Sequence, residues 1–182
     1  MVITIDGPAG VGKTTTAKKL ANKLGYQYLD TGAMYRAVTY FFGQHSTDIT
    51  SEDQVEKMLD ILNLELDFTS NNSIKVLLDG KDISLLIRSK AVTDAVSKVS
   101  ALKSVREKMV KIQKHTAKNG NFIIEGRDIG TVVFPDAKYK FFLTADYDVR
   151  AQRRLEDFKR VNEELNVNKI KQDLTDRDQY DS

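Results

Sequence analysis

The sequence predicts an α/β fold in which a parallel sheet carries helices on both faces, with a small antiparallel β insertion. Short apolar runs of strand length alternate with segments whose apolar residues recur at helical spacing, which favours parallel strands joined by right-handed crossovers. Between residues 63 and 86 apolar residues instead alternate with polar neighbours, which indicates antiparallel strands. The length of 182 residues, without an internal repeat or a low-complexity linker, favours one domain.

The elements of this fold are predicted one by one along the chain. The expected strands of the parallel sheet are residues 2–6, 26–29, 121–125 and 139–143. The expected helices begin near residues 13 and 31, cover 51–62 and 90–118, and continue from 146 onward. We expect Gly25 to end the first helix, Asp30 or Thr31 to cap the start of the second, and Ser51 to cap the third.

The segment 7–14 matches the phosphate-binding motif G-x-x-x-x-G-K-[ST], placed between an expected strand and an expected helix. Its glycines permit positive φ values and a close approach of backbone amides to phosphate, and the helix N-terminus favours an anion. Lys13 is expected to contact the β- and γ-phosphate oxygens, and the Thr14 hydroxyl to bind Mg²⁺. The expected nucleotide-binding residues are Gly7, Pro8, Ala9, Gly10, Val11, Gly12, Lys13, Thr14 and Thr15. The alternative is a glycine-rich turn with a solvated lysine.

The composition argues against several other kinds of site. The formal net charge of +2 gives no reason to expect binding to nucleic acid or to a membrane surface, and no apolar run approaches membrane-spanning length. The chain has no cysteine and 2 histidines, which excludes a disulfide framework or thiolate zinc site and disfavours a histidine metal centre. Because the first expected strand begins at residue 2, we expect no signal peptide and a cytoplasmic location.

Arginines lie near the ends of the expected strands, where ligands bind in parallel sheets. The loops at those ends are 7–14, 30–36 and 126–131. Two of them contain an arginine, and a cluster of three follows early in the last helix: Arg36, Arg127, Arg150, Arg153 and Arg154. Arginine offsets the repulsion between two phosphate groups, and an acceptor phosphate needs no base to become a nucleophile. The pattern therefore favours phosphoryl transfer onto a phosphate, and a solvated surface role is the alternative for each arginine.

Four segments resemble the bacterial-type cytidylate kinases, a family of nucleoside monophosphate kinases. They are residues 5–14, 29–36, 125–136 and 177–178, and the similarity extends from residue 2 to the end. The resemblance implies a phosphate-loop kinase that uses ATP and Mg²⁺, with CMP or dCMP as the acceptor, and we expect a monomer. It implies a monophosphate-binding insertion over about 63–100 and a mobile helical lid over about 145–165. The family continues with a last strand and a C-terminal helix that this sequence lacks, so we expect four parallel strands where the resemblance implies five.

The resemblance also assigns roles to individual positions. It implies that cytosine is recognised by Ser97, Arg106 and Asp128. The acceptor phosphate would be held by Tyr35, Arg36 and Arg127 with Thr31 nearby, and the ribose would meet Arg177 and Asp181. The expected catalytic residues are Lys13, Arg127 and Arg153, and Arg153 and Arg154 would swing in with the lid to exclude water.

The carboxylate of Asp128 suits the exocyclic amino group of cytosine and would oppose the carbonyl that uracil carries at the same place. For Ser97 and Arg106 a surface role is the alternative. Two other functions stay open, namely a kinase of another small acceptor and a non-catalytic switch that binds nucleotide.

Overall fold

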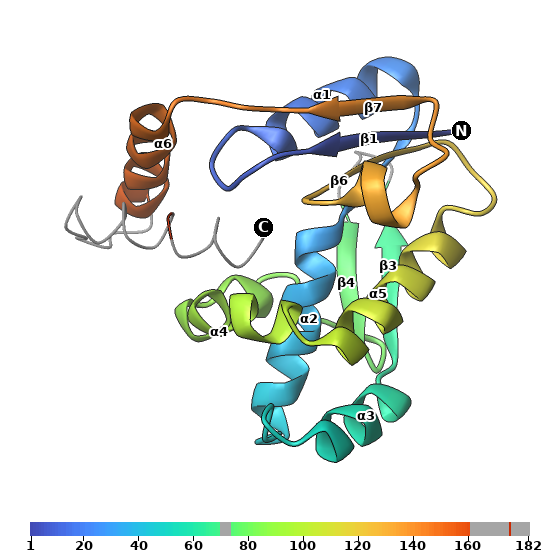
Figure 1. Cartoon of the computed structure of the whole chain (residues 1–182), viewed down its shortest axis with the longest axis vertical. Coiled ribbons are helices and arrows are strands. Elements are labelled where there is room, and N and C mark those ends of the chain that lie inside the picture. The colour runs from blue at the N-terminus through green and yellow to red at the C-terminus, as the bar shows by residue number, and fades with distance from the viewer. Residues whose placement is uncertain (70–73, 161–174, 176–182) are drawn as a thin grey trace.

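The computed structural model describes residues 1–69, 74–160 and 175, and for Arg154 and residues 157–160 it describes only the backbone. The strands are β1 Val2–Asp6, β2 Gln27–Asp30, β3 Leu64–Phe68, β4 Ile74–Leu78, β5 Lys81–Asp82, β6 Phe122–Gly126 and β7 Tyr139–Phe142. The helices are α1 Lys13–Leu24, α2 Thr31–Gln44, α3 Glu52–Ile61, α4 Lys90–Ser100, α5 Lys103–Thr116 and α6 Tyr147–Arg160. A 3₁₀ turn covers Leu86–Arg88, and a π-helical turn covers Ile129–Val133. Figure 1 shows β1, β6 and β7 side by side, and a second group of helices around β3 and β4.

The main sheet has the strand order β2-β6-β1-β7, and every neighbouring pair is parallel. Asp6, at the end of β1, lies level with Gly126 of β6 and Phe142 of β7. The carboxyl ends of these strands therefore meet at one edge of the sheet, as the alternating pattern of the sequence predicts. The predicted parallel sheet is confirmed.

One face of the sheet is covered by α1. Ile3 and Ile5 of β1 and Ile123 of β6 form a buried cluster with Ala17 and Ala21 of that helix. Small alanines let the helix approach the sheet closely, and successive strand residues point to opposite faces, so only alternate residues join this cluster.

The other face carries the larger core, which includes α2 and α5. Leu29, Phe122 and Ile124 of the strands are buried with Met34 and Val38 of α2. Burying each of these side chains contributes roughly 1.5–3 kcal/mol. Because the two clusters lie on opposite sides of the same strands, the predicted helices on both faces are confirmed.

The predicted antiparallel insertion is present as the sheet β3-β4-β5. Val76 and Leu78 of β4 are buried in the larger core, which attaches this small sheet to α2. The helical stretch predicted over 90–118 is two helices, because Leu102 takes an extended conformation with ψ of 127° and packs against the larger core. The loop predicted at 126–131 also differs, since it continues into the π-helical turn from residue 129.

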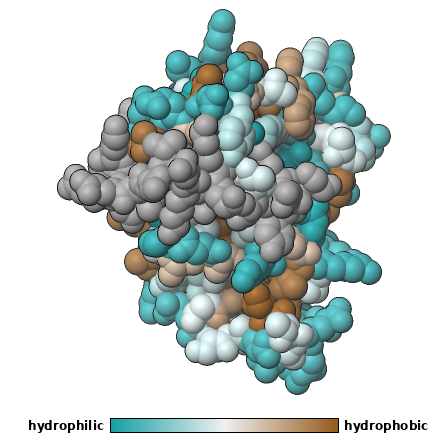
Figure 2. Space-filling view, turned by 60° about the vertical axis from the view of Figure 1, so that its left-hand side comes forward, coloured by the Kyte–Doolittle hydropathy of each residue, from teal (hydrophilic) through white to brown (hydrophobic). Residues whose placement is uncertain are grey.

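The described surface is mixed in character. Figure 2 shows hydrophilic residues over most of the described part of one face, with smaller hydrophobic areas between them. Such mixing is usual, because apolar atoms contribute much of any folded protein's accessible surface. Within residues 1–69 and 74–160, none of the helices combines the length and the apolar character that crossing a membrane requires.

Replacing Gly25 with alanine is expected to destabilise the fold by about 1 kcal/mol. Gly25 ends α1 in a left-handed conformation with φ of 66°, and no other atom lies within 4 Å of a Cβ built there, so the cost is purely conformational. Gly43 in α2 has equally open surroundings without a positive φ, and Gly43→Ala is expected to stabilise the fold by about 0.5 kcal/mol. Urea unfolding of both variants measures the difference, and equal effects at the two positions would contradict the predicted role of Gly25.

Candidate active site

The loop between β1 and α1 has the backbone that a phosphate cradle requires. Gly7, Gly10 and Gly12 have φ values of 146°, 77° and 98°, which residues with a side chain rarely adopt. A Cβ at Gly7 would also overlap the Leu143 carbonyl oxygen at the end of β7. Gly12 precedes α1 without a side-chain cap, so the first amides of the helix are available to a bound anion.

Lys13, the first residue of α1, lies at the centre of this loop. Its side chain is largely buried, and its Nζ donates hydrogen bonds to the carbonyl oxygens of Gly7 at 2.7 Å and Pro8 at 2.8 Å. The ammonium group is therefore held inside the curve of the loop, where a phosphate chain would meet the backbone amides.

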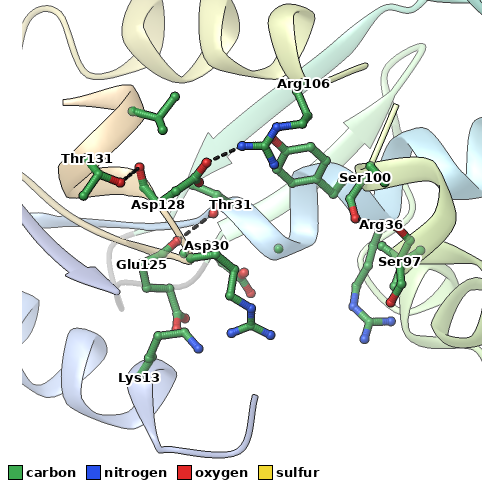
Figure 3. Close-up of a pocket in the computed structure, with 17 residues that line it drawn as sticks. Lys13, Asp30, Thr31, Arg36, Ser97, Ser100, Arg106, Glu125, Asp128 and Thr131 are labelled. Carbon is green, nitrogen blue, oxygen red and sulfur yellow. Dashed lines mark hydrogen bonds and ion pairs between the residues drawn. The ribbon is translucent and has the colours of Figure 1, made fainter. Parts of the chain in front are cut away.

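Beside the loop lies a pocket of about 680 Å³, which Figure 3 shows with its lining side chains. The lining contains eight of the residues singled out in the sequence: Lys13, Thr31, Tyr35, Arg36, Ser97, Arg106, Arg127 and Asp128. They come from α1, α2, α4, α5 and the segment after β6, which are far apart along the chain. The fold thus gathers the residues of the first strand–helix unit, the insertion and the β6 loop around one cavity.

The inner wall of the pocket carries an ion pair. Arg106 of α5 donates a hydrogen bond through Nη2 to Asp128 Oδ2, and both side chains are only partly exposed (Figure 3). Tyr35 of α2 lies close to this pair, and burial raises the pKa of its hydroxyl while the Arg106 charge opposes the rise. Asp128 therefore presents a carboxylate to the pocket in a defined orientation, with a guanidinium donor next to it.

Two further arginines line the pocket from different sides. Arg36 Nη1 donates hydrogen bonds to the Thr93 hydroxyl at 2.8 Å and to the Ile87 carbonyl oxygen at 3.3 Å. Arg127 Nη1 donates to the Gly7 carbonyl oxygen at 2.7 Å. Arg127 thus contacts the first residue of the phosphate loop and also lines the pocket, so it lies between the two halves of the site.

The last helix, α6, packs on the phosphate loop itself. Ala151 forms a small buried cluster with Ala9, and Arg150 Nη1 donates to the Ala9 carbonyl oxygen at 3.3 Å. Arg153 Nη1 donates to the Val11 carbonyl oxygen at 3.0 Å. Arg153 is not among the residues that line the pocket. Figure 1 shows α6 beside the turn between β1 and α1.

The sequence reasoning missed a buried acidic group at the carboxyl ends of β2 and β6. Glu125 is buried and accepts a hydrogen bond from the Tyr28 hydroxyl. Burial, followed by the nearby charge of Asp30, raises the pKa of the Glu125 carboxyl, and burial likewise raises the pKa of Tyr28. The Thr14 hydroxyl interacts with both groups. The sequence does offer a signal for this group, namely an acidic residue at the end of an expected strand, directly before Gly126.

The donor set near Thr14 consists of oxygens, the ligands that Mg²⁺ prefers. Thr14 supplies a hydroxyl, and Glu125 supplies a carboxylate beside it. No group of three His, Cys, Asp or Glu side chains is arranged to hold a metal among the residues that the structure describes. The residues therefore fit an ion that takes most of its ligands from phosphate and water, and Thr14 would hold it from the protein side.

Three of the predicted residues have side chains outside the part of the chain that the structure describes. Arg177 and Asp181 lie outside the described residues, as does the side chain of Arg154. Pocket-lining residues that the sequence reasoning did not single out include Ser100 and Thr131. Ser100 lies on a segment without a motif, whereas Thr131 ends the loop 126–131 that the sequence marks as a strand-end loop.

A family model described as cytidylate kinase matches residues 3–182 of the chain. The chain is 45% identical over 186 residues to the cytidylate kinase of Protochlamydia amoebophila, covering 100% of this chain and 81% of the relative. It is 44% identical over 182 residues to the cytidylate kinase of Lactobacillus gasseri, covering 100% and 79%. It is 46% identical over 182 residues to a bifunctional pantoate ligase/cytidylate kinase of Prochlorococcus marinus, covering 100% and 35%, so the chain spans about a third of that relative. The chain belongs to the cytidylate kinase family.

Proposed function

We propose that the chain transfers the γ-phosphoryl group of ATP to CMP or dCMP, giving ADP and CDP or dCDP. The observation that carries this proposal is that Lys13 of the phosphate loop and the Arg106–Asp128 pair line the same pocket. A site for a phosphate chain and a site with a carboxylate for base recognition are thus adjacent. The names of the relatives support cytidine nucleotides as the acceptors.

The ATP phosphates are assigned to the segment 7–15. The positive φ values of its glycines favour the inward-facing amides that such a cradle needs, and Lys13 adds a charge at the β- and γ-phosphates. When bound through Thr14 and the phosphates, Mg²⁺ would neutralise part of the charge on the transferred group.

The acceptor nucleotide is assigned to the far part of the pocket. The Asp128 carboxylate would accept from the exocyclic amino group of cytosine, and Arg106 would donate to its ring acceptors, with Ser97 beside them. Tyr35, Arg36 and Arg127 would hold the phosphate of CMP near Thr31. Arg177 and Asp181 are proposed to contact the ribose.

The chemical step requires little proton transfer. A phosphate oxygen of CMP attacks the γ-phosphorus of ATP in line, and the bond to the oxygen that bridges the β- and γ-phosphates breaks as the new bond forms. Arg127 lies between the loop and the pocket, where it would offset the repulsion of the two phosphate chains. Lys13 would stabilise the charge on the moving group from the loop side.

A coupled assay of ADP release with CMP, dCMP, UMP and AMP tests the function. We expect release that depends on the acceptor, with CMP and dCMP far above UMP and AMP. Turnover with another acceptor alone would identify a different small-molecule kinase. Binding of ATP without any acceptor-dependent release would identify a nucleotide switch instead.

We propose that the segment from about 145 to 165, of which residues 161–165 lie outside the described part of the chain, acts as a lid. Arg153→Ala should then lower turnover by about tenfold, while the KM for ATP changes less than about twofold. Arg153 contacts the loop through the Val11 carbonyl and does not line the pocket, and lid closure would bring it to the transferred phosphoryl. Steady-state kinetics at saturating CMP measure both constants. The control is Gln152→Ala, which changes an exposed neighbour on α6. Unchanged turnover in the Arg153 variant would show that Arg153 takes no part in catalysis.

A monomeric state and a cytoplasmic location are part of the same proposal. Size-exclusion chromatography with light scattering, at the protein concentration of the kinetic assay, tests the first of them.

A further inference from the structure

We infer that Asp6 is a positioning residue whose buried carboxylate holds the turn after Asp128, and thereby sets the preference of the site for cytosine over uracil. The inference rests on the proposed function, because it concerns the same acceptor pocket. Asp6 does not line that pocket, so it would act through Asp128.

The geometry of Asp6 is that of a clamp on the backbone. The residue is 5% exposed. Oδ1 accepts a hydrogen bond from the Ile129 amide and Oδ2 accepts one from the Gly130 amide, each at 2.8 Å. These are the first two amides after Asp128, so one carboxylate fixes the backbone that leads out of that residue.

The chemistry of the clamp requires a carboxylate. Two adjacent N–H groups need two acceptor oxygens, and an ionised carboxylate offers both in one short side chain without a donor. Hydrogen bonds to an ionised acceptor are roughly twice as strong as neutral ones. An asparagine would keep one acceptor oxygen, and its amide N–H would face a backbone N–H.

The turn that Asp6 holds is seated tightly on β1. A Cβ built at Gly130 would lie 2.7 Å from Thr4 Oγ1, 3.0 Å from a side-chain carbon of Lys140 and 3.2 Å from Asp6 Oδ2. The Val132 amide donates to the Asp128 carbonyl oxygen at 2.8 Å, which closes the turn from within. The backbone at Asp128 therefore has little room to shift while the two bonds to Asp6 are present.

The clamp also links the two halves of the site. Asp6 is the last residue of β1, and Gly7 of the phosphate loop follows it directly. The backbone carbonyl oxygen of Asp6 accepts a hydrogen bond from the Leu143 amide at 2.8 Å, which fixes Asp6 to the neighbouring strand β7. The position of the Asp128 carboxylate is thus set relative to the root of the phosphate loop, in addition to its ion pair with Arg106.

The test is the ratio of kcat/KM for CMP to kcat/KM for UMP in Asp6→Asn, measured by ADP release with the full chain. We expect the ratio to fall by about tenfold, since loss of one charge-assisted hydrogen bond lets the Asp128 turn move. The KM for CMP should rise more than the KM for ATP. A purely structural role for Asp6 would lower the melting temperature or the amount of active enzyme, but would leave the ratio unchanged.

Two further variants keep the test decisive. Asp136→Asn makes the same chemical change at an exposed carboxylate that does not line the pocket, and it should keep the wild-type ratio. Gly130→Ala disturbs the same turn through a Cβ that would crowd Thr4 Oγ1 and Asp6 Oδ2, and it should lower the ratio even where Asp6→Asn folds poorly. If Asp6→Asn or Gly130→Ala folds and keeps the wild-type ratio of kcat/KM for CMP to that for UMP, the inference is overturned. Absence of CMP-dependent release in the wild-type chain would instead overturn the proposed function.

Discussion

Replacing Lys13 with alanine is expected to lower kcat with CMP by about 1000-fold. Its ammonium group is buried within the phosphate loop and bonded to the carbonyl oxygens of Gly7 and Pro8, so its charge is held where the loop would bind the phosphates. Charge that is positioned before the reaction costs no reorganisation when the γ-phosphoryl group moves, and this accounts for the size of the effect. Coupled ADP release at saturating ATP and CMP measures it.

The matched control is Lys19→Ala, an exposed lysine of the same helix, which should keep wild-type turnover. The melting temperature of both variants separates loss of chemistry from loss of fold. Turnover of the Lys13 variant within about fivefold of wild type would show that the charge of Lys13 is not needed for the catalytic step.

Replacing Asp128 with asparagine is expected to reduce the preference for CMP over UMP by about 100-fold. The carboxylate would accept from the amino group of cytosine, whereas an asparagine would also offer a donor to the O4 carbonyl of uracil. Part of the reduced preference comes from weaker use of CMP, because Arg106 loses its charged partner and becomes less well oriented. We therefore expect kcat/KM to fall with CMP and to rise with UMP.

Competition between CMP and UMP in one reaction, with products separated by chromatography, measures the preference directly. Asp136→Asn is the control, since Asp136 is an exposed carboxylate a few residues beyond the same turn and does not line the pocket. Equal losses with both acceptors would show that Asp128 supports the fold of the loop and does not select the base.

Most of the fold was predictable because its signals are local. The motif around Gly7, the caps at Asp30 and Ser51, and Gly25 after α1 each depend on a few neighbouring residues. Asp30 accepts from the Ala33 amide at 3.0 Å, as its place before a helix predicts. The break between α4 and α5 was missed, because Leu102 leaves the helix for a tertiary contact that helical spacing does not reveal.

Site residues that belong to a motif or carry a charge in a strand-end loop were predictable from the sequence. Residues whose role depends on being buried against a distant segment were less so. The loops that contain Lys13 and Arg127 follow strand ends and are visible in the sequence. The Tyr28–Glu125 pair depends on β2 and β6 lying next to each other, which places residues 97 positions apart in contact. Asp6 was missed for the same reason, since its partners lie 123 and 124 residues further along the chain.

The central claim is that one cavity binds a donor and an acceptor phosphate together and selects the pyrimidine through Asp128. The most direct test is ADP release by the wild-type chain with CMP and with UMP at equal concentrations. We expect CMP to support release at a rate at least about 100 times that of UMP. Equal rates with the two nucleotides, or release that needs neither, would contradict the claim.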